Sequence, residues 1–207
     1  METTSYLRFR GLTISFDSRV LEPRPWTEAQ SGWAAALLAA APPGPVLELC
    51  AGVGHIGLGA VRDSPRHLVM VDLNPVAQRF ADENAAANGL ASRVEFRLSQ
   101  MEEALGGRER FALIVADPPW VRTEDTSMFP QDPLIAIDGG EDGLALARTC
   151  VDLIDRHLAE GGSALLQMGD VGQVDLLSDH ADQLPAGSVT VVETRAFLGG
   201  VIVRLAR

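Results

Sequence analysis

The sequence contains no lysine, so all 17 of its basic residues are arginines, and 28 acidic residues oppose them. The net charge of −11 makes the surface acidic. An acidic surface repels phosphate, whereas proteins that hold DNA or RNA unaided usually carry a basic patch. We therefore do not expect the chain to bind nucleic acid stably by itself.

Cysteines and long hydrophobic runs are also scarce. The two cysteines, Cys50 and Cys150, cannot build the disulfide framework of a secreted protein, and their spacing is not that of a metal site. The longest apolar run, residues 33–41, is far too short to span a membrane, and residues 1–6 lack the pattern of a secretion signal. The GxSxG motif of serine hydrolases is missing. These absences predict a cytoplasmic protein without a membrane partner or a bound metal.

The length and composition are those of one globular domain, which we assign to residues 1–207. Of these residues 46% are hydrophobic and 22% are charged, close to globular averages. Apolar runs that suit strands buried on both faces alternate with helical patterns, clearest at residues 75–88 and 143–158. Such alternation predicts an α/β fold with a parallel sheet between helices. The runs lie at residues 46–49, 67–71, 94–98, 111–116 and 163–168.

The C-terminal part of the chain departs from this alternation. Residues 188–195 and 201–206 are separated by a short stretch that ends in two glycines, which predicts a hairpin and therefore an antiparallel pair of strands. Residues 121–140 form the least structured stretch of the sequence. Long irregular loops in compact domains usually line substrate sites, so we expect this one to be functional.

The N-terminal part is an extension to the core. Residues 7–16 alternate as strands do, a proline-containing turn follows, and residues 27–41 have a helical pattern with Thr27 as the natural N-cap. We expect residues 1–44 to form this hairpin-and-helix extension and residues 45–207 to form the catalytic core.

A glycine turn follows the first core strand. Gly52, Gly54 and Gly57 satisfy GxGxxG, and Asp72 lies 20 residues after Gly52, where a ribose-binding acid belongs. The pattern fits a dinucleotide site and also fits the S-adenosylmethionine site of class I methyltransferases, which this segment resembles. Glu48, inside the strand, favours the methyl donor, because an acid suits a cationic sulfonium or amino group better than a pyrophosphate.

An Asp-Pro-Pro-Trp sequence, residues 117–120, follows the fourth apolar run, at the edge where open α/β sheets bind ligands. The two prolines stiffen the turn and leave nearby carbonyls free as acceptors. The Asp117 carboxylate and the Pro118 carbonyl would accept the hydrogens of a planar NH2 group, on which Trp120 would stack. The element resembles methyltransferases with an Asn/Asp-Pro-Pro-aromatic motif, which act on glutamine side chains or nucleobases.

Two flanking segments extend the resemblance to HemK-like protein glutamine methyltransferases. Residues 23–28, Pro-Arg-Pro-Trp-Thr-Glu, are similar to the segment before that group's glycine loop, and residues 132–144 are similar to its segment after the Pro-Pro motif. The similarity spans roughly residues 10–168. It implies the Rossmann-like class I methyltransferase fold, a seven-stranded and mostly parallel sheet with an antiparallel C-terminal strand and helices on both faces. It also implies S-adenosylmethionine as cofactor.

The resemblance further implies roles for individual residues. Gly52 and Gly54 would let the backbone reach the methionine part of the cofactor, and Glu48 would face its charged end. Asp72 would hold the ribose, and Gln100 would lie beside the adenine. The complete cofactor set is Thr27, Glu48, Cys50, Gly52, Gly54, Asp72, Leu73, Gln100 and Met101. The acceptor set is Arg24, Trp26, Asp117, Pro118, Pro119 and Trp120. A lone histidine at a helix start, His55, is interpreted as a surface or cap residue.

Three positions depart from the HemK-like pattern. Asp117 and Trp120 stand where that group normally has Asn and Tyr, and Asp is more frequent in methyltransferases that act on adenine. Gln100 stands where an adenine-reading Asp is common, although its amide oxygen can still pair with an exocyclic amine. Only about 45 residues precede the first core strand, so recognition of a release factor is expected to be absent or differently built.

Four hypotheses therefore stand. The leading one is methyl transfer to a protein glutamine, and the second replaces it with an exocyclic amine of RNA or DNA, or of a small molecule. A cluster such as Arg108 and Arg110, or a partner protein, would then supply positive charge. The third is an NAD-dependent oxidoreductase, and the fourth is a module that binds the cofactor without catalysis. The sequence predicts no oligomeric state.

Overall fold

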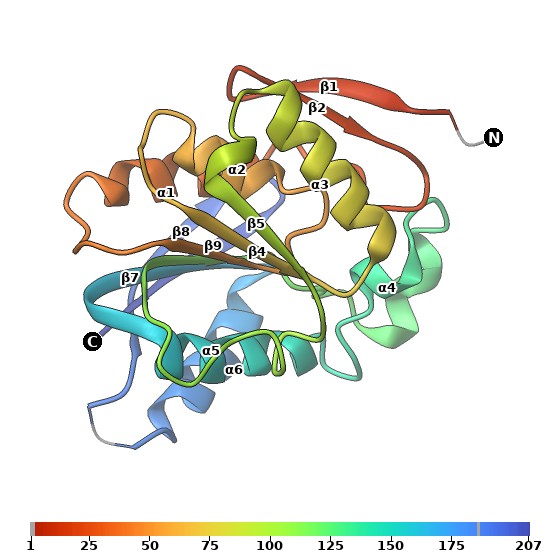
Figure 1. The fold of residues 1–207 in the computed structure, drawn as a ribbon. Helices are drawn as coiled ribbons and strands as arrows, with labels where there is room; N and C mark the ends of the chain where they lie inside the picture. Colours follow the sequence, from red (N-terminus) through yellow and green to blue (C-terminus); the bar gives the residue numbers. More distant parts are fainter. Residues whose placement is uncertain (1–2, 186) are drawn as a thin grey trace.

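The computed structural model describes residues 3–185 and 187–207. Its centre is a seven-stranded sheet in the order β5-β4-β3-β6-β7-β9-β8 (Figure 1). Strands β5 to β7 in this order are parallel, and β9 runs antiparallel to both β7 and β8. The predicted mostly parallel sheet with a C-terminal hairpin is confirmed. The strands are β3 Val46–Leu49, β4 Leu68–Asp72, β5 Val94–Leu98, β6 Phe111–Ala116, β7 Leu158–Met168, β8 Thr190–Phe197 and β9 Gly200–Ala206.

Helices cover both faces of this sheet, as its continuous apolar runs predicted (Figure 1). Every residue of the two central strands β3 and β6 is buried. One core cluster joins the sheet to α1, α2 and α3, and a second joins it to α5 and α6. The helices are α1 Thr27–Leu38, α2 His55–Val61, α3 Pro75–Ala87, α5 Ala145–His157 and α6 Val171–Asp182, with a short 3-10 helix η1 at Ala91–Arg93.

The N-terminal strands β1 (Ser5–Phe9) and β2 (Leu12–Phe16) form an antiparallel hairpin that packs on α3 (Figure 1). The buried side chain of Asn84 in α3 holds it there. Its Oδ1 accepts hydrogen bonds from the backbone N–H and the hydroxyl of Ser15, and its Nδ2 donates to the carbonyls of Ser15 and Val53. One amide therefore joins the hairpin, α3 and the glycine turn after β3.

The prediction that Thr27 caps the first helix is wrong. The residue at the N-cap position is Trp26, and no side chain caps the helix. The chain already turns helically from Arg24 onward, with the backbone N–H of Thr27 donating to the Arg24 carbonyl at 3.1 Å. The Thr27 hydroxyl also donates to that carbonyl, at 2.7 Å, so it bonds backward along the chain instead of capping the next turn.

Residues 121–140 are less irregular than the sequence predicted. They contain a 3-10 helix η2 (Thr123–Met128) and a one-turn helix α4 (Leu134–Ile137). An isolated bridge between Val121 and Asp138 joins the two ends of the segment. The strand predicted at residues 163–168 begins earlier, at Leu158. Among residues 3–185 and 187–207, no helix combines the length and apolarity that crossing a bilayer requires.

Candidate active site

The glycine turn and the Asp-Pro-Pro-Trp turn lie side by side. They follow β3 and β6, which are adjacent parallel strands whose last residues, Leu49 and Ala116, are paired in the sheet. The sheet order reverses direction at this pair of strands. Open α/β sheets bind ligands at the carboxyl ends of strands at such a switch point. The topology therefore brings the two sequence motifs to one site.

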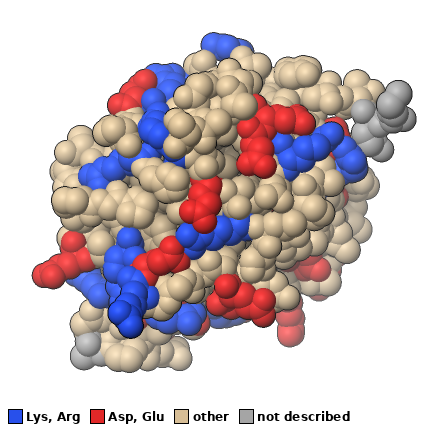
Figure 2. Space-filling view, viewed as in Figure 1, with Lys and Arg blue, Asp and Glu red and all other residues tan. Residues whose placement is uncertain are grey.

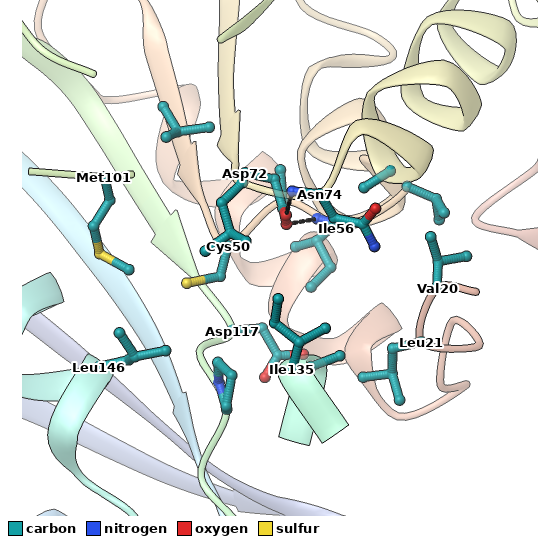
Figure 3. A pocket seen from close by; sticks show the side chains of 18 of the residues that line it. Val20, Leu21, Cys50, Ile56, Asp72, Asn74, Met101, Asp117, Ile135 and Leu146 are labelled. Atoms are coloured by element: carbon teal, nitrogen blue, oxygen red, sulfur yellow. Dashed lines mark hydrogen bonds between the residues drawn. The ribbon is translucent and has the colours of Figure 1, made fainter. Parts of the chain in front are cut away.

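A cavity of about 340 Å³ opens at this point (Figure 3). Asp72 and Asp117 lie on different sides of it, and Met101 and Leu146 close one end (Figure 3). Seven of the nine predicted cofactor residues line it: Thr27, Cys50, Gly52, Asp72, Leu73, Gln100 and Met101. The cavity is mostly apolar with a few convergent polar groups, which is typical of cofactor sites.

The glycine turn leaves room for a ligand at one position and for the core at another. Gly52 and Gly54 both have positive φ, 52° and 78°, which glycine adopts without strain. A Cβ on Gly52 would meet no atom within 4 Å, so the backbone there faces open space in the cavity. A Cβ on Gly54 would lie 2.6 Å from the Met70 sulfur, so this glycine serves packing.

Glu48, which we expected to face the charged end of the cofactor, does not line the cavity. Its side chain is 2% exposed and lies under the glycine turn, where Oε1 accepts a hydrogen bond from the Gly57 N–H at 3.0 Å. The other oxygen, Oε2, has no partner. Burial raises the pKa of Glu48 to about 8, so the carboxyl is largely neutral at pH 7. Through this hydrogen bond Glu48 stabilises the glycine turn from its buried side.

Asp72 ends β4 and is fixed by the backbone around it. Its two oxygens accept hydrogen bonds from the N–H groups of Gly52 (2.8 Å) and Asn74 (2.9 Å), shown as dashed lines in Figure 3. Burial raises the pKa of Asp72, and these bonds oppose the rise. A carboxylate oxygen accepts more than one hydrogen bond, so both can also receive the hydroxyls of a ribose.

His55 is a site residue that sequence reasoning missed. It lines the cavity, and its Nε2 lies 3.1 Å from the Thr27 hydroxyl. Because that hydroxyl donates its proton to the Arg24 carbonyl, the histidine must be the donor in this contact. Burial lowers the pKa of His55 to about 3, so the ring is neutral. The contact depends on how α1 packs against α2, which no local pattern reveals.

A second cavity of about 100 Å³ lies on the other side of Asp117. All six predicted acceptor residues line it: Arg24, Trp26, Asp117, Pro118, Pro119 and Trp120. The other lining residues are the apolar Leu21, Val121, Phe129, Ala136 and Ile137 and the acidic Asp132. Asp117 borders both cavities, and burial raises its pKa to about 7. Among the described residues, none hydrogen-bonds to its carboxylate. This carboxylate is therefore free to bind a ligand.

Two glycines pack closely against the two tryptophans that line the second cavity. A Cβ on Gly169 would lie 2.5 Å from Cε3 of Trp120, and one on Gly199 would overlap the ring of Trp26. The Trp120 carbonyl also accepts a hydrogen bond from Gln173 Nε2 at 2.8 Å. Each ring thus packs closely against a glycine. Stacking of Trp120 on an acceptor remains a prediction.

The fold and the site define a class I S-adenosylmethionine-dependent methyltransferase. The chain belongs to the methyltransferase small domain family, whose model matches residues 33–137. Membership of this family favours S-adenosylmethionine over a nicotinamide dinucleotide as the ligand predicted for the glycine turn.

Named relatives act on glutamine. The chain is 38% identical over 167 residues to a release factor glutamine methyltransferase of Cereibacter sphaeroides. This alignment covers 78% of the chain and 58% of that protein. It is 29% identical over 179 residues to a ribosomal protein uL3 glutamine methyltransferase of Francisella tularensis, covering 78% of the chain and 54% of that protein. The chain thus spans under two thirds of the length of these relatives.

Solved structures support the fold. The ribosomal protein L11 methylase of Lactobacillus delbrueckii subsp. bulgaricus aligns with a TM-score of 0.67 and 16% identity, over 91% of this chain and 81% of that one. An RNA methyltransferase from Salinibacter ruber, solved with S-adenosylhomocysteine, aligns with a TM-score of 0.56 and 16% identity, over 89% and 92%. The predicted Rossmann-like methyltransferase fold is confirmed.

Proposed function

We propose that the chain methylates the side-chain amide nitrogen of a glutamine in a protein substrate. The names of its relatives point to this acceptor, and the second cavity carries the proposal. A glutamine side chain is an apolar stem that ends in one planar group with an NH2 donor and a carbonyl acceptor. The cavity has apolar walls and, among the described residues that line it, the charged side chains Arg24, Asp117 and Asp132.

The cofactor residues take the following roles in this proposal. S-adenosylmethionine supplies an electrophilic methyl group on a sulfonium sulfur. The backbone at Gly52 would receive its methionine part, and Asp72 would hold the ribose hydroxyls. Gln100, Leu73 and Met101 would surround the adenine. Cys50, with a positive φ of 55°, and Thr27 would complete the walls of the 340 Å³ cavity around the cofactor.

The acceptor nitrogen would be positioned by the Asp-Pro-Pro-Trp turn. The Asp117 carboxylate and the Pro118 carbonyl would each accept one of its hydrogens and point the nitrogen toward the large cavity. Positioning of this kind can lower a barrier by about 7–11 kcal/mol. Pro119, Trp26 and Trp120 would enclose the stem of the side chain, because all three line the second cavity.

A base amine is the second candidate, and one observation favours it. Asp117 and Trp120 are the residue types more frequent in adenine methyltransferases. Against it, acidic and arginine side chains are interspersed on the face of the molecule seen in Figure 2, and the net charge is −11. A polyanion would be repelled overall, so RNA or DNA would need a partner protein or a local arginine cluster.

A labelling experiment tests the proposal. Purified release factor, ribosomal protein uL3 and total RNA are each incubated with the chain and methyl-labelled S-adenosylmethionine. An N-methylated amide releases labelled methylamine on strong hydrolysis, whereas a methylated base keeps its label on the base. We expect label in protein, released as methylamine, and its loss with Asp117→Ala. Asp179→Ala, an exposed aspartate of α6, is the matched control. Label that is confined to RNA contradicts the proposal.

A further inference from the structure

Arg24, which lines the second cavity, is fixed there by an ion pair. One of its terminal nitrogens, Nη2, donates to both oxygens of Asp132, at 2.7 and 2.6 Å. The Asp132 side chain is only 7% exposed and that of Arg24 is 24% exposed. Asp132 lies 108 residues further along the chain, in the segment between η2 and α4. The guanidinium is therefore fixed from one side, in a partly desolvated environment.

The backbone of Arg24 is fixed as well. Its carbonyl accepts hydrogen bonds from both the hydroxyl and the N–H of Thr27. The guanidinium carbon also lies 5.8 Å from the centre of the Trp26 ring, within range of a cation–π interaction. These contacts restrict the side chain before any acceptor arrives. A preorganised donor loses little entropy when it binds.

The hydrogen bonds of Arg24 use only Nη2, which leaves Nε and Nη1 without a partner among the described residues. Both Arg24 and Asp117 line the second cavity. The proposed acceptor has two polar ends, and Asp117 and Pro118 can only accept hydrogens from its nitrogen. The carbonyl oxygen of the amide needs a donor. Arg24 is the one cation among the described residues that line this cavity.

We propose that Arg24 donates a hydrogen bond from Nε or Nη1 to the carbonyl oxygen of the acceptor amide and stabilises the negative charge that develops there. The inference rests on the proposed function. The amide nitrogen forms a bond to the methyl carbon while the carbon–sulfur bond breaks and leaves its electron pair on sulfur. The N–H proton passes to the Asp117 carboxylate, and afterwards to water. The products are an N-methyl amide, S-adenosylhomocysteine and a proton.

This charge explains why an arginine would be used. An amide nitrogen is a poor nucleophile because its lone pair is delocalised onto the oxygen. As the nitrogen loses its proton, electron density gathers on that oxygen, where a partly desolvated donor acts more strongly than water does. A purely structural role for the Arg24–Asp132 pair, joining the N-terminal segment to residues 121–140, would affect folding and acceptor affinity but not the chemical step.

The test measures turnover with whichever protein, release factor or uL3, takes the label. We expect Arg24→Ala to lower kcat by about 10²- to 10³-fold, as loss of one oxyanion donor does. Affinity for S-adenosylhomocysteine, measured by calorimetry, should change less than about twofold. Added guanidine or methylguanidine should restore part of kcat in this variant. Arg24→Lys, which keeps the charge, should lose kcat too, since lysine lacks the planar fork that lets one guanidinium pair with Asp132 and point a further N–H at the amide.

Asp132→Asn is the matched variant, because it weakens the ion pair and keeps every donor of Arg24. It should raise KM more than it lowers kcat. If Arg24→Ala keeps kcat within about threefold and only raises KM or lowers the melting temperature, the role of Arg24 is purely structural and the inference is wrong. Arg24→Lys gives the same distinction if the alanine variant does not fold. Failure of the proposed function is recognised separately, by wild-type label that is not released as methylamine.

Discussion

The pH dependence of the wild-type enzyme should follow the ionisation of Asp117. Burial raises the pKa of this carboxyl to about 7, and only the ionised form can accept both a hydrogen bond and a proton from the acceptor. With that pKa, about one tenth of the enzyme is competent at pH 6 and about nine tenths at pH 8. We therefore expect kcat/KM to rise about tenfold between these two pH values.

Asp117→Asn separates this group from the others. The amide keeps one acceptor oxygen, as the Asn of HemK-like proteins does, but it does not ionise, so the rise with pH should disappear, and kcat/KM at pH 8 should fall by less than it does in Asp117→Ala. The assay is the initial rate of methyl transfer from pH 5.5 to 9, with affinity for S-adenosylhomocysteine measured at each pH. Constant affinity would place the ionisation in the acceptor step.

Two results would refute this reasoning. If the Asn variant retained the tenfold rise, another group would control it, and the candidate is Glu48, whose pKa burial raises to about 8. The variant Glu48→Gln distinguishes the two, because it should leave the profile in place if Asp117 is responsible. A wild-type profile that is flat from pH 6 to 8 would mean that Asp117 does not ionise in this range.

Three further predictions concern stability and cofactor affinity. Glu48 has a higher pKa folded than unfolded, so the protonated carboxyl favours the fold and stability falls as pH rises from about 4.5 to 8. Glu48→Gln keeps the bond from Gly57 and should raise the melting temperature at pH 9 but not at pH 5; equal gains at both would contradict this. Asn84→Ala leaves three buried backbone groups without partners and should cost about 3 kcal/mol in urea unfolding; a cost below about 1 would show that water replaces the amide. Gly54→Ala adds left-handed strain and a contact with Met70, and should weaken affinity for S-adenosylhomocysteine at least tenfold, about 1.4 kcal/mol. Gly89→Ala, with a φ of 72° and open space around it, is the control, and equal affinity in the two variants would refute the argument.

The sheet and the position of the site were predictable because they depend on patterns within short segments. The fully buried strands β3 and β6 were recognised from uninterrupted apolar runs, and the C-terminal hairpin from its two glycines. The glycine turn and the Asp-Pro-Pro-Trp turn each carry their own signature. Once the strands are parallel, their carboxyl ends must share one edge. Seven of the predicted cofactor residues and all six acceptor residues therefore line the two cavities.

What could not be predicted depends on contacts between distant segments. The direction of the Glu48 side chain is set by the N–H of Gly57, which is presented by the start of α2. The packing of α1 against α2 brings His55 to Thr27, and the return of residues 121–140 brings Asp132 to Arg24. None of these partners is a sequence neighbour, so no local periodicity signals them.

The Asn84 side chain makes the N-terminal hairpin part of the cofactor equilibrium. It bonds Ser15 in the hairpin and Val53 in the glycine turn at once, so detachment of the hairpin removes a constraint on the turn that we propose as the cofactor site. Thermodynamic linkage is reciprocal. A cofactor that binds the ordered turn must therefore also slow amide exchange in β1 and β2, although both strands belong to a separate sheet.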